Sequence, residues 1–338
     1  MTAVRVGILG TSRFARRAML PAMAGVPDVE VVAIASRDRD RAAGAVGGSG
    51  VRAVHGYAEL LDQDDVDAVY LPLPAALHAG WAEAALRAGK HVLAEKPVST
   101  DAGRTRQLCA LATESRLALV ENVMFVHHRL HHEVRKLLAA GVIGDFRAMH
   151  AAFTIPRLPD DDIRYQPHLC GGALWDVGVY PIRAAMHYLG SGLTVAGAVG
   201  TADPRLGVDI AGAAVLTAPS GAVATVMFGM DHAYHSGIEV CGSTGRLVID
   251  RPFTPPADHR PKITLFDGTG AREILLDPDD QARNTVEAFV RAVRSRTPPE
   301  PAIADQARLL AAVRARAGAA AEREASWRSS ATGSWPRI

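Results

Sequence analysis

The sequence predicts an α/β protein in which a parallel sheet covered by helices is followed by an α+β domain with a large, mostly antiparallel open sheet. Strand and helix patterns alternate with short loops through the first third of the 338 residues, which is typical of a parallel sheet. Near residue 123 the pattern changes to β-rich segments separated by Gly and Pro. A Gly-containing turn also joins the first strand to a helix, as in dinucleotide-binding domains. We expect a Rossmann domain over 1–123, an α+β domain over 124–325 and a tail over 326–338.

The elements of the first domain are expected from short apolar runs and from helical periodicity. The predicted strands cover residues 4–9, 29–35, 68–71, 91–94 and 117–120. The predicted helices cover 78–88 and 100–115, in addition to the one that follows the first strand.

The second domain is expected to hold most of the antiparallel strands and one long helix. The predicted strands cover residues 146–155, 195–199, 212–217, 222–229, 238–241, 246–249 and 263–266. Helices are predicted over 128–140, over 173–189 and, late in the chain, over 303–322. We expect the last helix to pack back on the first domain.

Composition favours a cytoplasmic enzyme. The chain is 48% apolar with a net charge of +1, so it has enough apolar residues for real cores and no basic surface for nucleic acid or a membrane. Three widely spaced cysteines, Cys109, Cys170 and Cys241, form no C-x-x-C pair and are expected to be reduced thiols. The first predicted strand begins at residue 4, and no apolar run is long enough for a membrane span, so we expect neither a signal peptide nor a membrane anchor.

The turn after the first strand is the first candidate site. It is made of Gly10, Thr11, Ser12, Arg13, Phe14 and Ala15. Backbone N–H groups and the positive end of the next helix would face a pyrophosphate there. Ser12 stands where the usual pattern has a second Gly, but it is small enough for close backbone approach, and Ala15 allows tight helix packing. The alternative is an ordinary strand-to-helix turn.

The end of the second strand indicates which dinucleotide is preferred. Enzymes that use NAD usually place Asp or Glu there, whereas this chain has Ser36 followed by Arg37. A hydroxyl and a guanidinium suit a 2′-phosphate, so the sequence favours NADP. Arg39 and Arg41 are interleaved with acidic residues and are expected to lie on a solvated charged loop.

Two further segments carry candidate catalytic residues. Glu95, Lys96 and Pro97 directly follow a predicted strand, which places them at the carboxyl edge of the sheet, where ligands bind. Proline favours extended geometry at Lys96, which directs its ammonium group. Asp176 and Tyr180 are four residues apart and share a helix face, so both can face one cleft. The alternatives are a surface lysine, a core tyrosine and a carboxylate that stabilises the helix N-terminus.

These motifs together resemble the glucose-fructose oxidoreductase, inositol dehydrogenase and rhizopine-catabolism oxidoreductase (Gfo/Idh/MocA) family over nearly the whole chain. Within that family the chain looks most like the sugar 3-ketoreductases of antibiotic deoxysugar pathways. Besides Ala15 and the non-Gly residue at position 12, the segments that carry this resemblance are 70–74 (YLPLP), 121–128 (ENVMFVHH), 163–166 (IRYQ), 180–185 (YPIRAA) and 228–234 (FGMDHAY).

The resemblance implies roles for particular residues. It implies that Lys96 and Tyr180 are the active-site pair, with Tyr180 where many relatives have His. In the mechanism that we expect, Asp176 orients either group. The resemblance implies further cofactor contacts at Leu73, Pro74, His78, Glu95 and Lys96. Ala75 departs from the Asn that many relatives carry, which puts one polar cofactor contact in doubt. The candidate substrate contacts are Lys96, His127, Arg164, Tyr165, Asp176, Tyr180 and His232.

We expect no metal site, because the cluster of His127, His128, His131 and His132 lacks the Glu of an H-E-x-x-H motif. The resemblance also implies a homodimer or homotetramer formed through the C-terminal sheet.

The function expected from the resemblance is reduction of the C3 ketone of a dTDP-3,4-diketo-2,6-dideoxyhexose by NADPH. Lys96 would stabilise the oxyanion, and Tyr180, with its pKa lowered by the nearby ammonium, would donate the proton. Two alternatives stay open: an NAD(P)-dependent dehydrogenase of a free polyol or sugar such as inositol, and a non-catalytic NADP-binding sensor. The presence of both Lys96 and Tyr180 argues against a sensor.

Overall fold

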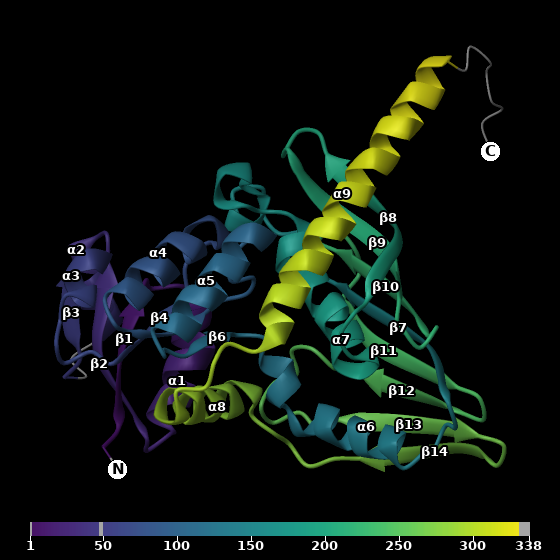
Figure 1. Ribbon diagram of the computed structural model, residues 1–338, viewed down its shortest axis with the longest axis horizontal. Coiled ribbons are helices and arrows are strands. Elements are labelled where there is room, and N and C mark those ends of the chain that lie inside the picture. Colours follow the sequence, from purple (N-terminus) through teal and green to yellow (C-terminus); the bar gives the residue numbers. More distant parts are fainter. Residues whose placement is uncertain (1, 47–49, 331–338) are drawn as a thin grey trace.

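The computed structural model describes residues 2–46 and 50–330 and contains two sheets with helices packed against them (Figure 1). The chain passes from the first sheet to the second between Glu121 and Phe146. An α/β fold with a parallel and a mostly antiparallel sheet is therefore confirmed.

The first sheet is six-stranded and entirely parallel, in the order β3-β2-β1-β4-β5-β6. Its strands are β1 (Val4–Leu9), β2 (Val29–Ser36), β3 (Arg52–His55), β4 (Ala68–Leu71), β5 (His91–Ala94) and β6 (Leu119–Glu121). This is the strand order of a Rossmann fold, in which the direction of winding reverses between β1 and β4 and opens a crevice at their carboxyl ends. The edge strand β3 is absent from the sequence prediction, because a four-residue segment with an exposed Arg at its start has little apolar pattern.

Helices cover both faces of this sheet. They are η1 (Ala15–Met19), α1 (Leu20–Ala24), α2 (Arg39–Val46), α3 (Tyr57–Leu61), α4 (Ala75–Arg87) and α5 (Ala102–Glu114). One face packs mainly on α3, α4 and α5, and the other on η1 and α1. The second face is completed by α8 (Gln281–Ser295), whose Val286 and Phe289 pack with Ile8 and Leu93. The sequence prediction omits α8, although Asp280 caps its first turn and its apolar residues recur at helical spacing.

The second sheet is eight-stranded, in the order β14-β13-β12-β11-β7-β10-β9-β8. Its strands are β7 (Phe146–Thr154), β8 (Thr194–Asp203), β9 (Val208–Thr217), β10 (Val223–Gly229), β11 (His235–Gly242), β12 (Arg246–Asp250), β13 (Lys262–Asp267) and β14 (Gly270–Leu275). All neighbours are antiparallel except β7 and β10, which are parallel. The sequence prediction omits β14, which is largely exposed.

One face of the second sheet is covered by helices, as Figure 1 shows for α6 (Arg129–Ala139) and α7 (Val179–Leu189). Three short 3₁₀ segments, η2 (Met124–His127), η3 (Ile163–Tyr165) and η4 (Pro167–Leu169), lie in the connections. The helix expected over 173–189 forms, but its first turn is the π-helical segment η5 (Leu174–Gly178). The aromatic centre of this core contains Phe125, Phe153, Phe228 and Phe253.

The last helix, α9 (Pro301–Ser330), packs in the hydrophobic cores of both sheets. Ile303 packs in the core of the first sheet, whereas Leu309, Leu310 and Val313 pack in the core of the second. The expected contact with the first domain is therefore present at the start of α9 only, and most of the described helix runs along β8 and α7. Residues 326–330 of the expected tail continue this helix, and 331–338 lie outside the described residues.

Candidate active site

Lys96 and Asp176 come together at the carboxyl edge of the first sheet. Lys96 lies just after β5, and Asp176 lies in η5 of the second half of the chain. The Lys96 Nζ donates to Asp176 Oδ1 at 2.9 Å and to the Asp176 carbonyl oxygen at 2.6 Å. The Lys96 side chain is 13% exposed. A cationic group is thus fixed in a largely dehydrated position, where its charge acts more strongly than it would in water.

Arg164 contacts the same carboxylate from the other side. Its Nε donates to Asp176 Oδ2 at 2.8 Å, and its Nη1 donates to Asp162 Oδ1 at 3.1 Å. Burial by itself would raise the pKa of Asp176, but Lys96 and Arg164 together lower it to about 2. Burial would conversely lower the pKa of Lys96, but Asp176, followed by the other acidic groups nearby, raises it above its usual value. Both groups are therefore charged at neutral pH.

Tyr180 lies beside this ion pair. The Lys96 Nζ is 5.1 Å from the centre of the Tyr180 ring, and the ring packs edge-on against Phe153 with 5.1 Å between centroids. Burial raises the pKa of Tyr180 by more than Lys96 lowers it, so the net direction is upward. The expectation of a lowered phenol pKa is therefore wrong, because the aromatic surroundings outweigh one neighbouring ammonium.

The start of the helix that carries Asp176 and Tyr180 is anchored by its neighbours. The Leu174 N–H donates to Asp209 Oδ2 at 2.7 Å, which satisfies a free donor at the helix end. A Cβ on Gly178 would lie 3.0 Å from the Phe228 ring, so this position has room only for a small residue. These contacts seat η5 on the second sheet and direct Asp176 toward Lys96.

The turn of Glu95 and Lys96 is held by partly buried hydrogen bonds. Glu95 Oε1 accepts from the Tyr70 hydroxyl at 2.6 Å and from Asn122 Nδ2 at 2.6 Å. Glu95 thus ties β4 to the segment after β6 and fixes the backbone from which Lys96 extends. The sequence prediction includes Tyr70 and Asn122 in segments that carry the family resemblance, but it assigns neither a role in the site; Tyr70 lies near the end of β4, and Asn122 directly follows β6.

His78, a predicted cofactor contact, is buried between two loops. It is 1% exposed, and its two ring nitrogens lie 2.7 Å from the Pro97 carbonyl oxygen and 2.6 Å from the Leu73 carbonyl oxygen. The ring therefore joins the loop that contains Leu73 and Pro74 to the loop that follows Lys96. In this conformation His78 positions both loops and has no free surface for a cofactor.

The turn after β1 has the geometry that a dinucleotide requires. Gly10 has a φ of +117°, and its N–H donates to the Ala35 carbonyl oxygen at 2.9 Å. A Cβ at this position would lie 3.0 Å from Leu73 Cδ2, so a side chain would be strained and crowded. Ser12 Oγ accepts from the Ala15 N–H at 3.0 Å and caps the next helix, while Arg13 and Phe14 are exposed.

The two residues predicted to bind a 2′-phosphate at the end of β2 differ in exposure. Ser36 is buried, and its Oγ accepts from the Asp38 N–H at 3.2 Å, whereas Arg37 is exposed. Next to this strand end, a cavity of about 290 Å³ is lined by Thr11, Arg16, Arg41, Gly44 and Ala45. Two guanidinium groups thus flank a space that opens beside the β1 turn. The Arg41 side chain is 75% exposed, as expected for a solvated residue, and it also lines this cavity together with Thr11.

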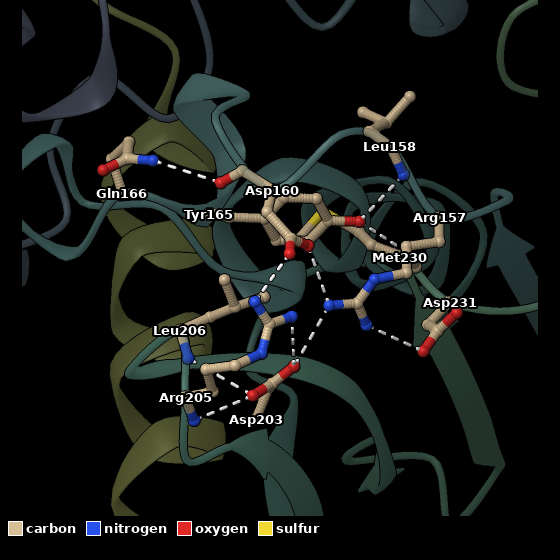
Figure 2. Close-up of polar contacts among 10 residues, drawn as sticks. All are labelled: Arg157, Leu158, Asp160, Tyr165, Gln166, Asp203, Arg205, Leu206, Met230 and Asp231. Carbon is tan, nitrogen blue, oxygen red and sulfur yellow. Dashed lines mark hydrogen bonds and ion pairs between the residues drawn. The ribbon is translucent and has the colours of Figure 1, made fainter.

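The segment from Ile155 to Gly172 brings Arg164 to Asp176, and Figure 2 shows the polar network that holds it. Arg157 pairs with Asp160, Asp203 and Asp231 at 3.0 to 3.2 Å, and Arg205 pairs with Asp160 at 2.6 Å. Asp203 ends β8, and Asp231 follows β10. One arginine therefore joins this segment to two other loops.

Tyr165 lies at the centre of Figure 2 and is 1% exposed. Its hydroxyl donates to the Met230 carbonyl oxygen at 2.8 Å and accepts from the Leu158 N–H at 3.1 Å. Tyr165 is thus a packing residue here, and its predicted contact with substrate has no free surface to make it.

The other candidate histidines range from buried to exposed. His131 is buried between the Tyr188 hydroxyl at 2.6 Å and the Pro252 carbonyl oxygen at 2.8 Å, and His128 caps α6 by accepting from the Leu130 N–H. His127 is half-buried, and burial, followed by the charge of Arg183, lowers its pKa to about 4. His232 is exposed on the loop after β10. Among residues 2–46 and 50–330, no three His, Cys, Asp or Glu side chains gather as metal ligands would.

Comparison with known proteins agrees with this geometry. Residues 4–123 match an oxidoreductase family with an NAD-binding Rossmann fold, and residues 131–248 match the GFO/IDH/MocA C-terminal domain. The chain therefore belongs to the GFO/IDH/MocA oxidoreductases. Within the part of the chain that is described, no helix has both the length and the apolar content to cross a membrane.

Individual relatives are more specific. A dTDP-3,4-didehydro-2,6-dideoxy-α-D-glucose 3-reductase from Streptomyces violaceoruber is 51% identical over 86% of each chain. The crystal structure of a 3-ketoreductase from Actinomadura kijaniata, in complex with NADP and TDP-benzene, superposes with a TM-score of 0.90 at 47% identity and covers 93% of this chain and 98% of that one. A D-xylose 1-dehydrogenase (NADP⁺) from Haloferax volcanii is 37% identical over 87% of this chain and 90% of its own length.

Proposed function

We propose that this chain is an NADPH-dependent sugar 3-ketoreductase that reduces the C3 ketone of a dTDP-3,4-diketo-2,6-dideoxyhexose in deoxysugar biosynthesis. The observation that carries the proposal is the Lys96 ammonium, fixed on Asp176 and 5.1 Å from the Tyr180 ring. This is a cation beside a proton donor at the sheet edge where a dinucleotide binds. The names of the relatives that are about 50% identical support the substrate class.

The residues at this edge fit NADP. The Gly10 turn leaves backbone donors free of side-chain cover, and Arg16 and Arg41 flank a cavity beside it that suits a phosphate. We assign the 2′-phosphate to Arg37 and Arg41, with Ser36 shaping the loop through its bond to Asp38. NADPH supplies a hydride when it is bound.

Lys96 and Tyr180 perform complementary steps in this proposal. As negative charge builds on the C3 oxygen, Lys96 stabilises it without reorganising, because Asp176 already holds the ammonium in place. Tyr180 donates the proton to that oxygen. Its raised pKa keeps the phenol protonated at neutral pH, so the acid is present in the form that the reaction requires.

The substrate contacts are assigned to the wall formed by the second sheet. We place Arg164 there because its side chain reaches Asp176 from the segment that follows β7. His127 and His232 remain candidates: the first lies in η2 and the second on the loop after β10. Tyr165 is left out because its hydroxyl is engaged with Met230.

The test is turnover of the diketo sugar, generated in situ by a 2,3-dehydratase because it is unstable. We expect NADPH oxidation with a kcat on the order of 1–10 s⁻¹ and conversion of the C3 ketone to a carbinol. Calorimetric titration with NADPH, NADH and dTDP comes first, because it needs no unstable compound. Tight binding of NADPH and dTDP supports the proposal, whereas binding of NADPH without dTDP contradicts it.

A free-sugar dehydrogenase is the competing function, since the Haloferax volcanii relative is named for D-xylose. Oxidation of D-xylose or inositol with NADP⁺, at rates similar to those of the diketo-sugar reaction, would favour it.

We also propose that the protein acts in the cytoplasm as a homodimer or homotetramer. The face of the second sheet that carries Val199 and Val215 supports this, because these large apolar side chains are exposed on β8 and β9. Light scattering of the purified protein tests the oligomeric state, and a monomer at micromolar concentration would contradict it.

A further inference from the structure

A buried ion pair joins the two sheets behind the active site. Glu121 is the last residue of β6, and Arg183 lies in α7; each is 5% exposed. Arg183 Nη1 lies 3.4 Å from Glu121 Oε2, and Gln306 of α9 donates to the same oxygen from its Nε2 at 2.8 Å. Arg183 also reaches Glu300 at 3.4 Å. Three distant parts of the chain thus share one carboxylate.

The two residues of this pair are connected to the two proposed catalytic residues. Glu121 Oε1 accepts from the Val98 N–H at 3.0 Å, and Val98 lies two residues after Lys96. Arg183 lies three residues after Tyr180, one turn along the same helix. A second connection between Lys96 and Tyr180, besides the direct bonds of Lys96 to Asp176, therefore runs through the Glu121 carboxylate and Arg183.

The pair is more than ordinary packing, because a buried charge depends on its partner. Burial raises the pKa of Glu121, and the net direction stays upward although Arg183 and the Val98 N–H act against it, so loss of Arg183 would favour the neutral acid further. A hydrophobic contact of equal volume would join the same elements without fixing their relative orientation. An ion pair flanked by hydrogen bonds fixes both distance and orientation.

We propose that the Glu121–Arg183 pair sets the spacing between Lys96 and Tyr180, so that both reach one carbonyl oxygen. Both are positioning residues, since their polar contacts are to Val98, Gln306, Glu300 and each other. The predicted fall in kcat rests on the proposed function, whereas the predicted change in the distance between Lys96 and Tyr180 does not.

The experiment separates positioning from stability. Arg183→Met leaves Glu121 buried without its partner and should lower Tm by more than about 5 °C. The double variant E121Q/R183M removes both charges, keeps an oxygen for Val98, and should regain most of the lost Tm. We expect its kcat at 20 °C to stay at least tenfold below that of the wild type, with KM for NADPH within threefold. Arg183→Lys, which keeps the charge, should retain kcat within threefold.

Leu265→Ala is the matched stability control, because Leu265 is buried in β13 and has no place in the proposed site. Its cavity should lower Tm while kcat stays unchanged. A crystal structure of E121Q/R183M provides a readout that needs no substrate. We expect the Lys96 Nζ to move by more than about 1 Å from its present 5.1 Å separation from the Tyr180 ring.

The inference is overturned if the double variant recovers kcat together with Tm, or if its Lys96–Tyr180 distance is unchanged. If the wild type fails to reduce the diketo sugar, the proposed function fails, and the crystallographic distance alone then decides the inference.

Discussion

Asp176 accepts two hydrogen bonds from Lys96, one at its carboxylate and one at its backbone carbonyl oxygen. The bond to the backbone places the Lys96 ammonium beside η5. The Asp176 carboxylate, which also accepts from Arg164, raises the pKa of Lys96 and so keeps the ammonium charged. The spacing of Asp176 and Tyr180 in the sequence predicts a shared cleft, and the structure adds that Asp176 holds the Lys96 ammonium.

Asp176→Asn tests this dependence through pH. In the wild type, Asp176 raises the pKa of Lys96 above its ordinary value, so the protonated form required for catalysis persists to high pH. Without the carboxylate, burial lowers the pKa of Lys96, and the charged form is lost as pH rises through the new, lower value. We therefore expect the basic limb of the kcat profile to shift to lower pH, with kcat at pH 7 down by about 10- to 100-fold.

Asp162→Asn is the control, because Asp162 contacts Arg164 and not Lys96. Its basic limb should stay where the wild-type limb is. If the Asp176→Asn profile also keeps its basic limb, Asp176 does not control the charge of Lys96.

Tyr180→Phe separates the hydroxyl from the ring. The ring packs against Phe153 and Phe253, so the phenylalanine should preserve Tm within about 2 °C. Loss of the proton donor should lower kcat by about 10²- to 10⁴-fold with little change in KM for NADPH. Stopped-flow measurement of NADPH oxidation provides both constants. Ordinary turnover in this variant would mean that Lys96, water or the substrate supplies the proton.

The first sheet shows how far sequence reasoning extends. Strands such as β1 and β4 are apolar runs that a parallel sheet buries on both faces, so their position and direction could be predicted. The helix α8 could not be placed as easily, because its partner is a sheet more than 150 residues earlier in the chain. Its amphipathic pattern predicts a helix but says nothing of which apolar face it covers.

The candidate active site could likewise be predicted only in part. Lys96, Asp176 and Tyr180 could be predicted from strand ends and helix spacing, because those patterns carry geometric information. The buried hydrogen bonds of His78 and Tyr165 could not be predicted from sequence, since each is a polar residue whose partners are backbone carbonyl oxygens distant in the chain. The raised pKa of Tyr180 follows from its burial, and the rings that pack on it include Phe153 and Phe253, from two different parts of the second half of the chain.

Arg41→Ala tests the assignment of the 2′-phosphate. If Arg41 and Arg37 bind that phosphate, Arg41→Ala and Arg37→Ala should each raise KM for NADPH by about tenfold, while KM for NADH stays within about twofold. Arg39→Ala is the matched control, because Arg39 lines a different cavity near β3 with Arg52 and His55. Equal losses toward NADPH and NADH would place Arg41 near the shared pyrophosphate instead.

Arg157→Met tests whether the network of Figure 2 holds the substrate wall in place. Single surface ion pairs contribute little, but Arg157 joins three carboxylates from three loops and also lies 5.7 Å from the Tyr165 ring. Its loss should free the segment that carries Arg164, so KM for the sugar nucleotide should rise about 5- to 20-fold. Lys96 keeps its own two hydrogen bonds to Asp176 when Arg164 is released, so kcat should fall by a smaller factor than KM for the sugar nucleotide rises. The Gly10 turn lies outside this segment, so KM for NADPH should change by less than about twofold.

Salt provides an independent check on the same network. Exposed ion pairs are screened by added salt, so the wild-type KM for the sugar nucleotide should rise between 0.05 and about 0.5 M NaCl more steeply than that of Arg157→Met. Arg246→Met is the control, since it removes an exposed pair with Glu239 on the second sheet, away from the segment of Figure 2. An Arg157→Met enzyme with the wild-type KM and the wild-type salt response would show that packing around Tyr165 holds the segment without the arginine.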